Sequence, residues 1–239
     1  MTILDKFHAI TTFLFISFAF LSSANNLFDI EYLPFDNIPK KILNQCKGDI
    51  VDTVIWKDKN GIFAFVAFKK KQGKIGETLK SELTVFLFKI FSKDSVQQLW
   101  KIYDWANDGL TVIDYRKESR RIIDIDNDGE HESIFIYEKI PDGLEPIEVK
   151  LILHHRFQKY AIRGRFPKDE QYLDTYEKNI DYSFRRCDKR IFLFASDYWD
   201  KMVREYAKDL LGETLVDSMI NIHNDSKKQY IMKPPPKQK

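Results

Sequence analysis

Five acidic side chains occupy alternate positions of one short segment. They are Asp124, Asp126, Asp128, Glu130 and Glu132. Calcium binds roughly six to eight oxygen ligands, and carboxylates at positions 1, 3 and 5 of a tight loop can converge on one ion. Gly129, at the sixth position, permits the sharp turn that brings the next backbone carbonyl inward. The pattern therefore predicts a structural Ca²⁺ site.

The segment differs from an EF-hand in its ligands and its flanks. The twelfth position is Phe135 rather than a bidentate Glu. The carbonyl of Glu130 would be the seventh-position ligand and the carboxylate of Glu132 the ninth. Strand-like sequence precedes and follows the loop, so it looks like the short calcium loop of integrin-type propeller repeats, present here in a single copy. The alternative is a solvated acidic turn, which would leave like charges crowded together without a counter-ion.

A second group of charged residues follows two later strands. Lys150, Lys159, Arg163 and Arg165 predict a possible anion-binding face, and the alternative is an ordinary solvated sheet face. The nearby pair at 154–155 consists of two histidines, whose side chains point to opposite faces of a strand, so a polar pair beside a turn is expected. The sequence contains no serine nucleophile elbow, phosphate loop or paired-cysteine metal motif. We therefore assign no catalytic residue.

The N-terminal segment is typical of a signal peptide. Lys6 precedes an apolar stretch at 9–21, and small residues at 22–24 offer a cleavage site. We expect residues 1–24 to direct export to the periplasm or the extracellular space. The alternative is an uncleaved membrane anchor, although the stretch is shorter than the roughly 20 apolar residues that a span needs. No later segment is apolar enough to cross a membrane.

Export would place Cys46 and Cys187 in an oxidising compartment, where two otherwise unpartnered thiols usually pair. A disulfide between them would close a long loop and contribute about 4–5 kcal/mol by chain entropy. The alternative is two separate buried thiols.

Composition and pattern predict the fold. The net charge is only +2 in 239 residues, which argues against a dedicated nucleic-acid binder, and the 14% aromatic content favours strands. Strands are expected at 50–56, 62–69, 83–91, 99–105, 110–115, 121–125, 133–138, 148–154 and 159–163.

An apolar stripe then predicts one helix between an N-cap at Asp188 and Gly212; its members are Phe192, Ala195, Trp199, Met202, Val203, Tyr206 and Leu210. The predicted class is α+β and mainly β. It would be an antiparallel meander, either a sandwich or an open barrel, with the helix packed on it. Residues 25–212 would form a single domain, and 213–239 a flexible, charged, Pro-rich tail.

Three segments carry a resemblance to a known family. The acidic run 124–129 is followed by Val-Lys-Leu-Ile-Leu-His at 149–154 and by Lys-Tyr-Ala-Ile-Arg-Gly at 159–164. Together they resemble a family of small exported bacterial proteins loosely labelled surface polysaccharide biosynthesis proteins. The resemblance covers roughly residues 50–207. It implies an envelope or polysaccharide association and no defined reaction. Members often carry a lipoprotein cysteine, which this chain lacks after its apolar run.

These observations give three functional hypotheses. The first is an exported, calcium-stabilised, non-catalytic envelope protein linked to surface polysaccharide assembly, with a cell-surface polysaccharide or an envelope protein as partner. The second is a glycan-acting enzyme that uses acids such as Asp142 or Glu148, which would need paired carboxylates about 5–10 Å apart in a cleft. The third is a protein-binding inhibitor or adhesion module that uses an aromatic-rich sheet edge.

Overall fold

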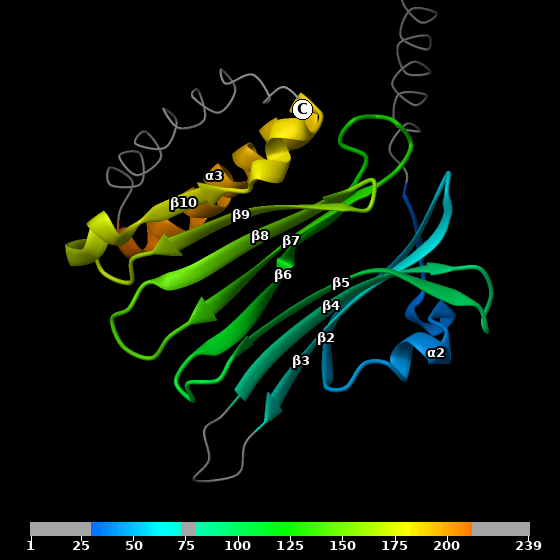
Figure 1. The fold of residues 1–239 in the computed structure, drawn as a ribbon, viewed down its shortest axis with the longest axis horizontal. Helices are drawn as coiled ribbons and strands as arrows, with labels where there is room; N and C mark the ends of the chain where they lie inside the picture. The colour runs from blue at the N-terminus through cyan, green and yellow to red at the C-terminus, as the bar shows by residue number, and fades with distance from the viewer. Residues whose placement is uncertain (1–29, 73–79, 212–239) are drawn as a thin grey trace, which may run out of the picture. The chain divides into compact units, whose positions relative to one another are not determined.

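The computed structural model describes residues 30–72 and 80–211 (Figure 1). The predicted signal peptide at 1–24 and the predicted tail at 213–239 lie outside the described residues. Strands β2 to β10 belong to one compact unit that begins at Tyr32. Within the described part, no helix has the length and apolar character needed to cross a membrane.

The unit is built on two antiparallel five-stranded sheets. The first has the order β1-β2-β3-β4-β5, with bounds Glu31–Leu33, Asp49–Asp58, Gly61–Gln72, Lys80–Ile90 and Val96–Ala106. The second has the order β10-β9-β8-β7-β6, and β6 to β10 span Val112–Ile123, Glu132–Ile140, Ile147–His155, Gln158–Phe166 and Glu177–Ile180. The sheets are not closed into a barrel. The predicted α+β, mainly β class with an antiparallel arrangement is therefore confirmed.

The β2–β3 hairpin forms where the sequence predicts it. Gly61 adopts a φ of 129°, and the ladder runs directly up to the pair Asp58 and Gly61. The Asp58 carboxylate accepts a hydrogen bond from the backbone N–H of Asn60 at 2.7 Å. Such Asx hydrogen bonds stabilise tight turns. This turn also places Asp58 and Lys59 beside the acidic loop, as described below.

Alternate residues of the central strands serve two hydrophobic layers, because successive side chains of a strand point to opposite faces. On β3, Phe65 packs edge-on against Phe135 of β7, with ring centroids 5.4 Å apart. Its neighbours Ala64 and Val66 belong instead to a cluster with Ile42 on the outer face of the first sheet. That outer face is covered by the short helices η2 (Phe35–Asn37) and α2 (Lys40–Leu43).

The outer face of the second sheet is covered by α3 (Lys189–Leu211), as Figure 1 shows. Two 3₁₀ helices, η3 (Glu170–Thr175) and η4 (Tyr182–Arg186), precede the helix on either side of β10. The predicted N-cap is confirmed, because the carboxylate of Asp188 accepts the backbone N–H of Arg190 at 2.7 Å. Most members of the predicted apolar stripe are buried against β7, β8 and β9: Phe192, Ala195, Trp199, Met202 and Val203.

Gly164 of β9 is required for this close packing. A Cβ added at Gly164 would lie 2.3 Å from the carbonyl oxygen of Glu177 and 2.7 Å from the ring of Trp199. Side-chain carbons do not approach other heavy atoms that closely. The absence of a side chain at this position therefore allows β10 and α3 to approach the sheet.

Two strands predicted at 110–115 and 121–125 are one strand, β6, with an irregular middle. The pairing with β7 shifts between Arg116 and Arg121. Inside the bulge, the hydroxyl of Ser119 donates to the carbonyl of Arg116 at 2.6 Å and accepts the backbone N–H of Ile136 at 2.9 Å. The Ser119 hydroxyl takes the place of a backbone carbonyl as the acceptor for β7. Strand β6 therefore continues through a polar segment that, in the sequence, indicates a break between two strands.

The predicted disulfide is wrong. Cys46 and Cys187 are both free thiols. Cys46 packs against the cluster under α2, whereas Cys187 packs against the cluster under α3. A disulfide needs Cα atoms within about 7 Å, and here the two residues pack into different hydrophobic clusters. The alternative reading, two separate partly buried thiols, describes the structure, and burial raises the pKa of Cys187 to about 11.

Candidate metal site

The acidic loop is held at both ends by the β6–β7 ladder. The last paired residues are Ile123 and Glu132, so Asp124 directly follows one strand and Glu132 begins the next. Two residues of the loop have positive φ, Asn127 at 55° and Gly129 at 82°. Glycine adopts this conformation without steric cost, and asparagine tolerates it better than most residues. The loop therefore makes the sharp turn predicted at its sixth position.

The carboxylate of Asp124 turns inward and organises the loop backbone. Its two oxygens accept the backbone N–H groups of Asp128 at 3.0 Å and Gly129 at 2.8 Å. The carboxylate of Asp128 accepts the N–H of Glu130 at 2.8 Å. These contacts bring three of the predicted ligands together, because oxygen atoms of Asp124, Asp126 and Asp128 all lie within 4.8 Å of one another.

Asp126 also belongs to a second cluster, formed with Glu132 and His155. Their ligand atoms likewise lie within 4.8 Å of one another, and all three side chains are buried. Asp126 therefore joins both groups and connects four of the five predicted acidic ligands. The side chain of the fifth, Glu130, belongs to neither group, and its carboxylate lies 3.8 Å from the Lys59 ammonium. Its predicted contribution is the backbone carbonyl rather than the carboxylate.

The carboxylate of Asp126 is only half satisfied. The residue is 4% exposed, and its Oδ1 has no hydrogen-bond partner in the described part of the chain. Its Oδ2 lies 3.8 Å from the guanidinium of Arg156, which is an ion-pair distance without a hydrogen bond. An unpaired buried carboxylate is costly, and proteins normally pair such a group or bind a metal with it. Asp126 thus belongs to both carboxylate clusters and has an oxygen without a hydrogen-bond partner.

Three cationic side chains from distant parts of the sequence surround the loop. Arg156 pairs with the Asp128 carboxylate at 2.9 Å, Lys59 donates to the carbonyl of Asp128, and Arg190 donates to the carbonyl of Asp126. Burial would raise the pKa of Asp128, but hydrogen bonds from Arg156 and from the backbone N–H of Glu130, together with the charges of Lys59 and Arg156, lower the pKa. These cations neutralise carboxylates on the outside of the loop and so reduce the crowding of like charges that argues against a solvated turn. None of the three forms a hydrogen bond with Oδ1 of Asp126.

His155 is the contact that sequence reasoning missed. Its Nδ1 lies 2.8 Å from Glu132, whose second oxygen accepts the N–H of Ile125 at 2.8 Å. Glu132 is 1% exposed, and burial raises its pKa. His154 and His155 lie beside the β8–β9 turn, as expected, but both rings are buried. Only the alternation of strand faces predicts that the two rings have different partners.

Three of the four basic residues predicted to form an anion-binding face have carboxylates beside them. Lys150 pairs with Asp104 at 2.5 Å, Arg165 lies 3.8 Å from Glu177, and Arg163 pairs with Asp181. The fourth, Lys159, lies opposite His154 in the ladder. Since carboxylates already accompany three of the four, the described structure gives no reason to propose an anion site on this face.

Comparison with known proteins adds no further constraint. No family model, no curated protein and no solved structure matches the chain. The resemblance to the surface polysaccharide biosynthesis proteins consequently stays a hypothesis based on the sequence.

Proposed function

We propose that the protein is an exported, non-catalytic, β-rich envelope protein whose loop at 124–132 binds a structural Ca²⁺. The observation that carries the calcium proposal is the buried carboxylate of Asp126, which belongs to both acidic clusters and has one oxygen without a hydrogen-bond partner among the described residues. The side chains of Asp124, Asp126, Asp128 and Glu132, with the carbonyl of Glu130, would supply the oxygen ligands that calcium prefers.

A cation here would have a structural role. The candidate ligands belong to the loop and to the first residue of β7, so binding would fix the connection between two adjacent strands. The ion would also remove the repulsion among carboxylates that lie within 4.8 Å of one another. Export and a link to surface polysaccharide rest on the N-terminal sequence and on the family resemblance.

Thermal unfolding tests the calcium proposal. A ligand that binds only the folded state stabilises it, by about 2.7 kcal/mol at 100 times its Kd. We expect calcium to raise the melting temperature above its value in chelator, and magnesium to raise it less, because Mg²⁺ demands tighter octahedral geometry. Asp126→Asn should abolish the calcium shift, whereas Asp142→Asn, in an exposed turn, should retain it. An equal melt with calcium and chelator would refute the site.

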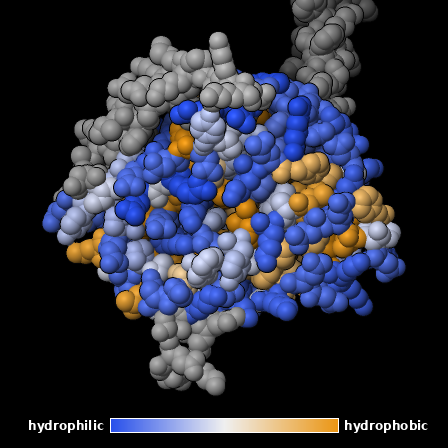
Figure 2. All heavy atoms as spheres, viewed as in Figure 1, coloured by the Kyte–Doolittle hydropathy of each residue, from blue (hydrophilic) through white to orange (hydrophobic). Residues whose placement is uncertain are grey.

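A binding module is the second candidate, and one surface observation favours it. Edge strand β5 exposes Tyr103 and Trp105, which stack with ring centroids 5.5 Å apart. Figure 2 shows hydrophobic side chains gathered toward the side of the first sheet, on a face that is otherwise mainly hydrophilic. Exposed aromatic groups at a sheet edge suit protein recognition. Pull-down of an envelope partner that Trp105→Ala abolishes would favour this candidate.

A further inference from the structure

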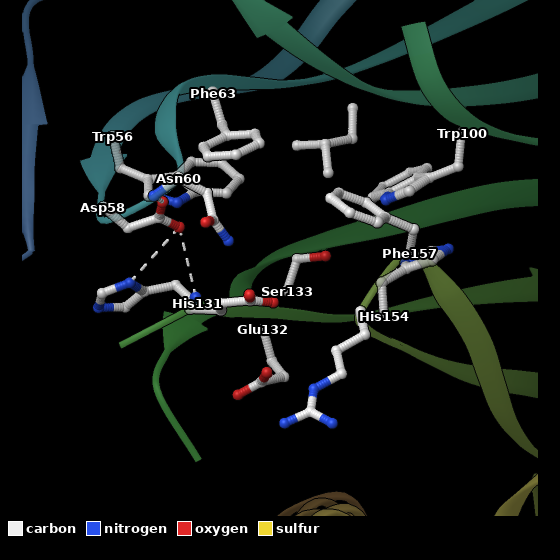
Figure 3. Close-up of a pocket in the computed structure, with 13 residues that line it drawn as sticks. Trp56, Asp58, Asn60, Phe63, Trp100, His131, Glu132, Ser133, His154 and Phe157 are labelled. Carbon is white, nitrogen blue, oxygen red and sulfur yellow. Dashed lines mark hydrogen bonds and ion pairs between the residues drawn. The ribbon is translucent and has the colours of Figure 1, made fainter. Parts of the chain in front are cut away.

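A small pocket lies between the two sheets, next to the acidic loop but distinct from the converging carboxylates (Figure 3). Trp56 and Phe63 line it from β2 and β3, Trp100 from β5, Ser133 from β7 and His154 from β8. Figure 3 shows Trp56, Asp58 and Asn60 facing His131 and Ser133 across the gap, with Asp58 joined to His131.

Buried polar atoms without partners are concentrated in this pocket. Among the described residues they include the indole Nε1 of Trp56, the indole Nε1 of Trp100, the hydroxyl of Ser133 and both ring nitrogens of His154. All four residues are at most 9% exposed. Buried polar groups in folded proteins are nearly always hydrogen-bonded, and an unsatisfied group costs about 1–3 kcal/mol. A polar group bound in this pocket could satisfy these donors and acceptors.

The identity of these atoms defines what the occupant must offer. An indole N–H can only donate, so both tryptophans require acceptors. The ring of His154 lies flat on Trp100, with centroids 3.7 Å apart, and burial lowers its pKa to about 3. The imidazole is therefore neutral and offers one donor and one acceptor. The hydroxyl of Ser133 can do either. An occupant needs several acceptor oxygens and at least one donor.

The charges around the pocket disfavour an anionic occupant. Asp58 and Glu130 are among the residues that line it, against the single arginine, Arg156. The Glu132 carboxylate points away from the gap in Figure 3 and bonds to His155. This acidic surrounding disfavours an anion. The inner indole N–H donors cannot coordinate a cation. Hydroxyl groups are uncharged and both donate and accept, so they satisfy every requirement.

The shape of the pocket is consistent with a ring that enters by its edge. The enclosed part has room for about two water-sized groups. Aromatic side chains flank the space, including Phe63 and the 57% exposed Phe157 of the β8–β9 turn. Aromatic faces pack well against the C–H faces of a sugar ring, while its hydroxyls reach inward.

We propose that this pocket binds the hydroxyl groups of a neutral saccharide. The site goes beyond the calcium loop and does not depend on it, although the two adjoin at Glu130 and Glu132. A single sugar or the end of a longer glycan would present the same hydroxyls. Because only a small part of the ring is enclosed, we expect dissociation constants in the millimolar range.

The indole N–H resonances of the four tryptophans provide the test. Trp56 and Trp100 line the pocket, whereas Trp105 is exposed elsewhere and Trp199 donates to Tyr176 at 3.3 Å. In heteronuclear NMR titrations with D-glucose and with maltotriose, the signals of Trp56 and Trp100 should shift, and those of Trp105 and Trp199 should not. Tighter binding of maltotriose would identify the end of a glycan as the preferred source.

A charged sugar of the same ring provides the matched ligand control. D-glucuronate should bind at least about tenfold more weakly than D-glucose, because the acidic surrounding disfavours its carboxylate. Equal binding of D-glucuronate would overturn the argument from charge. No shift of the two pocket signals by either neutral sugar at about 100 mM would overturn the proposal and leave ordered water as the occupant.

Matched variants separate this site from the calcium loop. Trp56→Phe keeps an aromatic ring but removes one donor, and should weaken sugar binding about tenfold. Trp105→Phe should leave binding unchanged. Asp126→Asn should abolish the effect of calcium on melting yet retain the sugar-induced shifts. Ser133→Ala, which removes a hydroxyl without enlarging the residue, serves if Trp56→Phe does not fold. Full binding by both pocket variants would refute the assignment.

Discussion

Two buried aspartates show what distinguishes a structural carboxylate from a candidate ligand. Asp104, on β5, is 9% exposed and fully engaged: Lys139 lies at 2.7 Å and Lys150 at 2.5 Å, and the Tyr137 hydroxyl donates at 2.9 Å. Asp126, in the acidic loop, is as deeply buried but has one oxygen without a partner. Burial alone therefore does not indicate function. The informative feature is the incomplete set of partners.

Removing the charge of Asp104 should have the largest effect. Asp104→Asn would leave the partly buried ammonium groups of Lys139 and Lys150 without their counter-ion. Breaking such a pair on one side costs about 3–5 kcal/mol, and urea unfolding would measure it. The loss should be the same with calcium and with chelator. Asp142→Asn is the exposed control and should stay within about 0.5 kcal/mol of the wild type. A loss below about 1 kcal/mol would contradict the comparison.

Asp126→Asn in chelator should behave in the opposite way. Without a cation, the substitution removes a buried charge that has no full partner, so stability should rise by about 1 kcal/mol. The same urea experiment in calcium should show a net loss, because the variant forfeits the stabilisation by the ion. If Asp126→Asn in chelator were as costly as Asp104→Asn, the carboxylate would have a protein partner after all, and the metal proposal would fail.

Acid should weaken the Asp104 interactions. Burial would raise the pKa of Asp104, but hydrogen bonds from Lys139 and Lys150 outweigh it and lower the pKa. Its stabilisation is therefore complete above the unfolded value of about 3.9 and is lost as the pH falls through the lower folded pKa. Each unit of depression corresponds to about 1.4 kcal/mol. The stability difference between wild type and Asp104→Asn should shrink below about pH 4. A stability difference between wild type and Asp104→Asn that stays constant as the pH falls below about 4 would disprove this account.

The smallest effect concerns a cation beside the loop. Lys59 has a side chain 47% exposed and lies 3.8 Å from the carboxylates of Asp128 and Glu130. Lys59→Gln should change stability by less than about 1 kcal/mol, as is usual for exposed ion pairs. It should slightly tighten calcium binding in calorimetry, because one competing positive charge is removed. Loss of calcium binding would show that Lys59 organises the loop rather than competing with the ion.

The sequence predicts the elements well where local signals decide them. The Asn60-Gly61 turn, the alternating apolar strands and the capped helix after Asp188 all depend on neighbours within a few residues. Prediction failed where a distant partner or an irregularity decides. The bulge around Ser119 reads as a break, and no local pattern shows that Cys46 and Cys187 pack into different hydrophobic clusters.

The candidate site was predictable in the same partial way. The spacing of Asp124, Asp126 and Asp128 indicates the convergence that the loop shows. The contacts of Arg156 and His155 with the loop depend on how β8 returns beside β7, which no local pattern specifies. The pocket between the sheets was not predictable, because Trp56, Trp100 and His154 meet only after the sheets have packed.

Gly164 gives a structural reason for the segment at 159–164, the most distinctive of the three segments that resemble the known family. The run at 159–164 ends at this glycine, where any side chain would collide with the carbonyl of Glu177 and the ring of Trp199. In a saturation mutagenesis survey, this position would therefore tolerate almost no replacement, even though it touches neither the acidic loop nor the inter-sheet pocket.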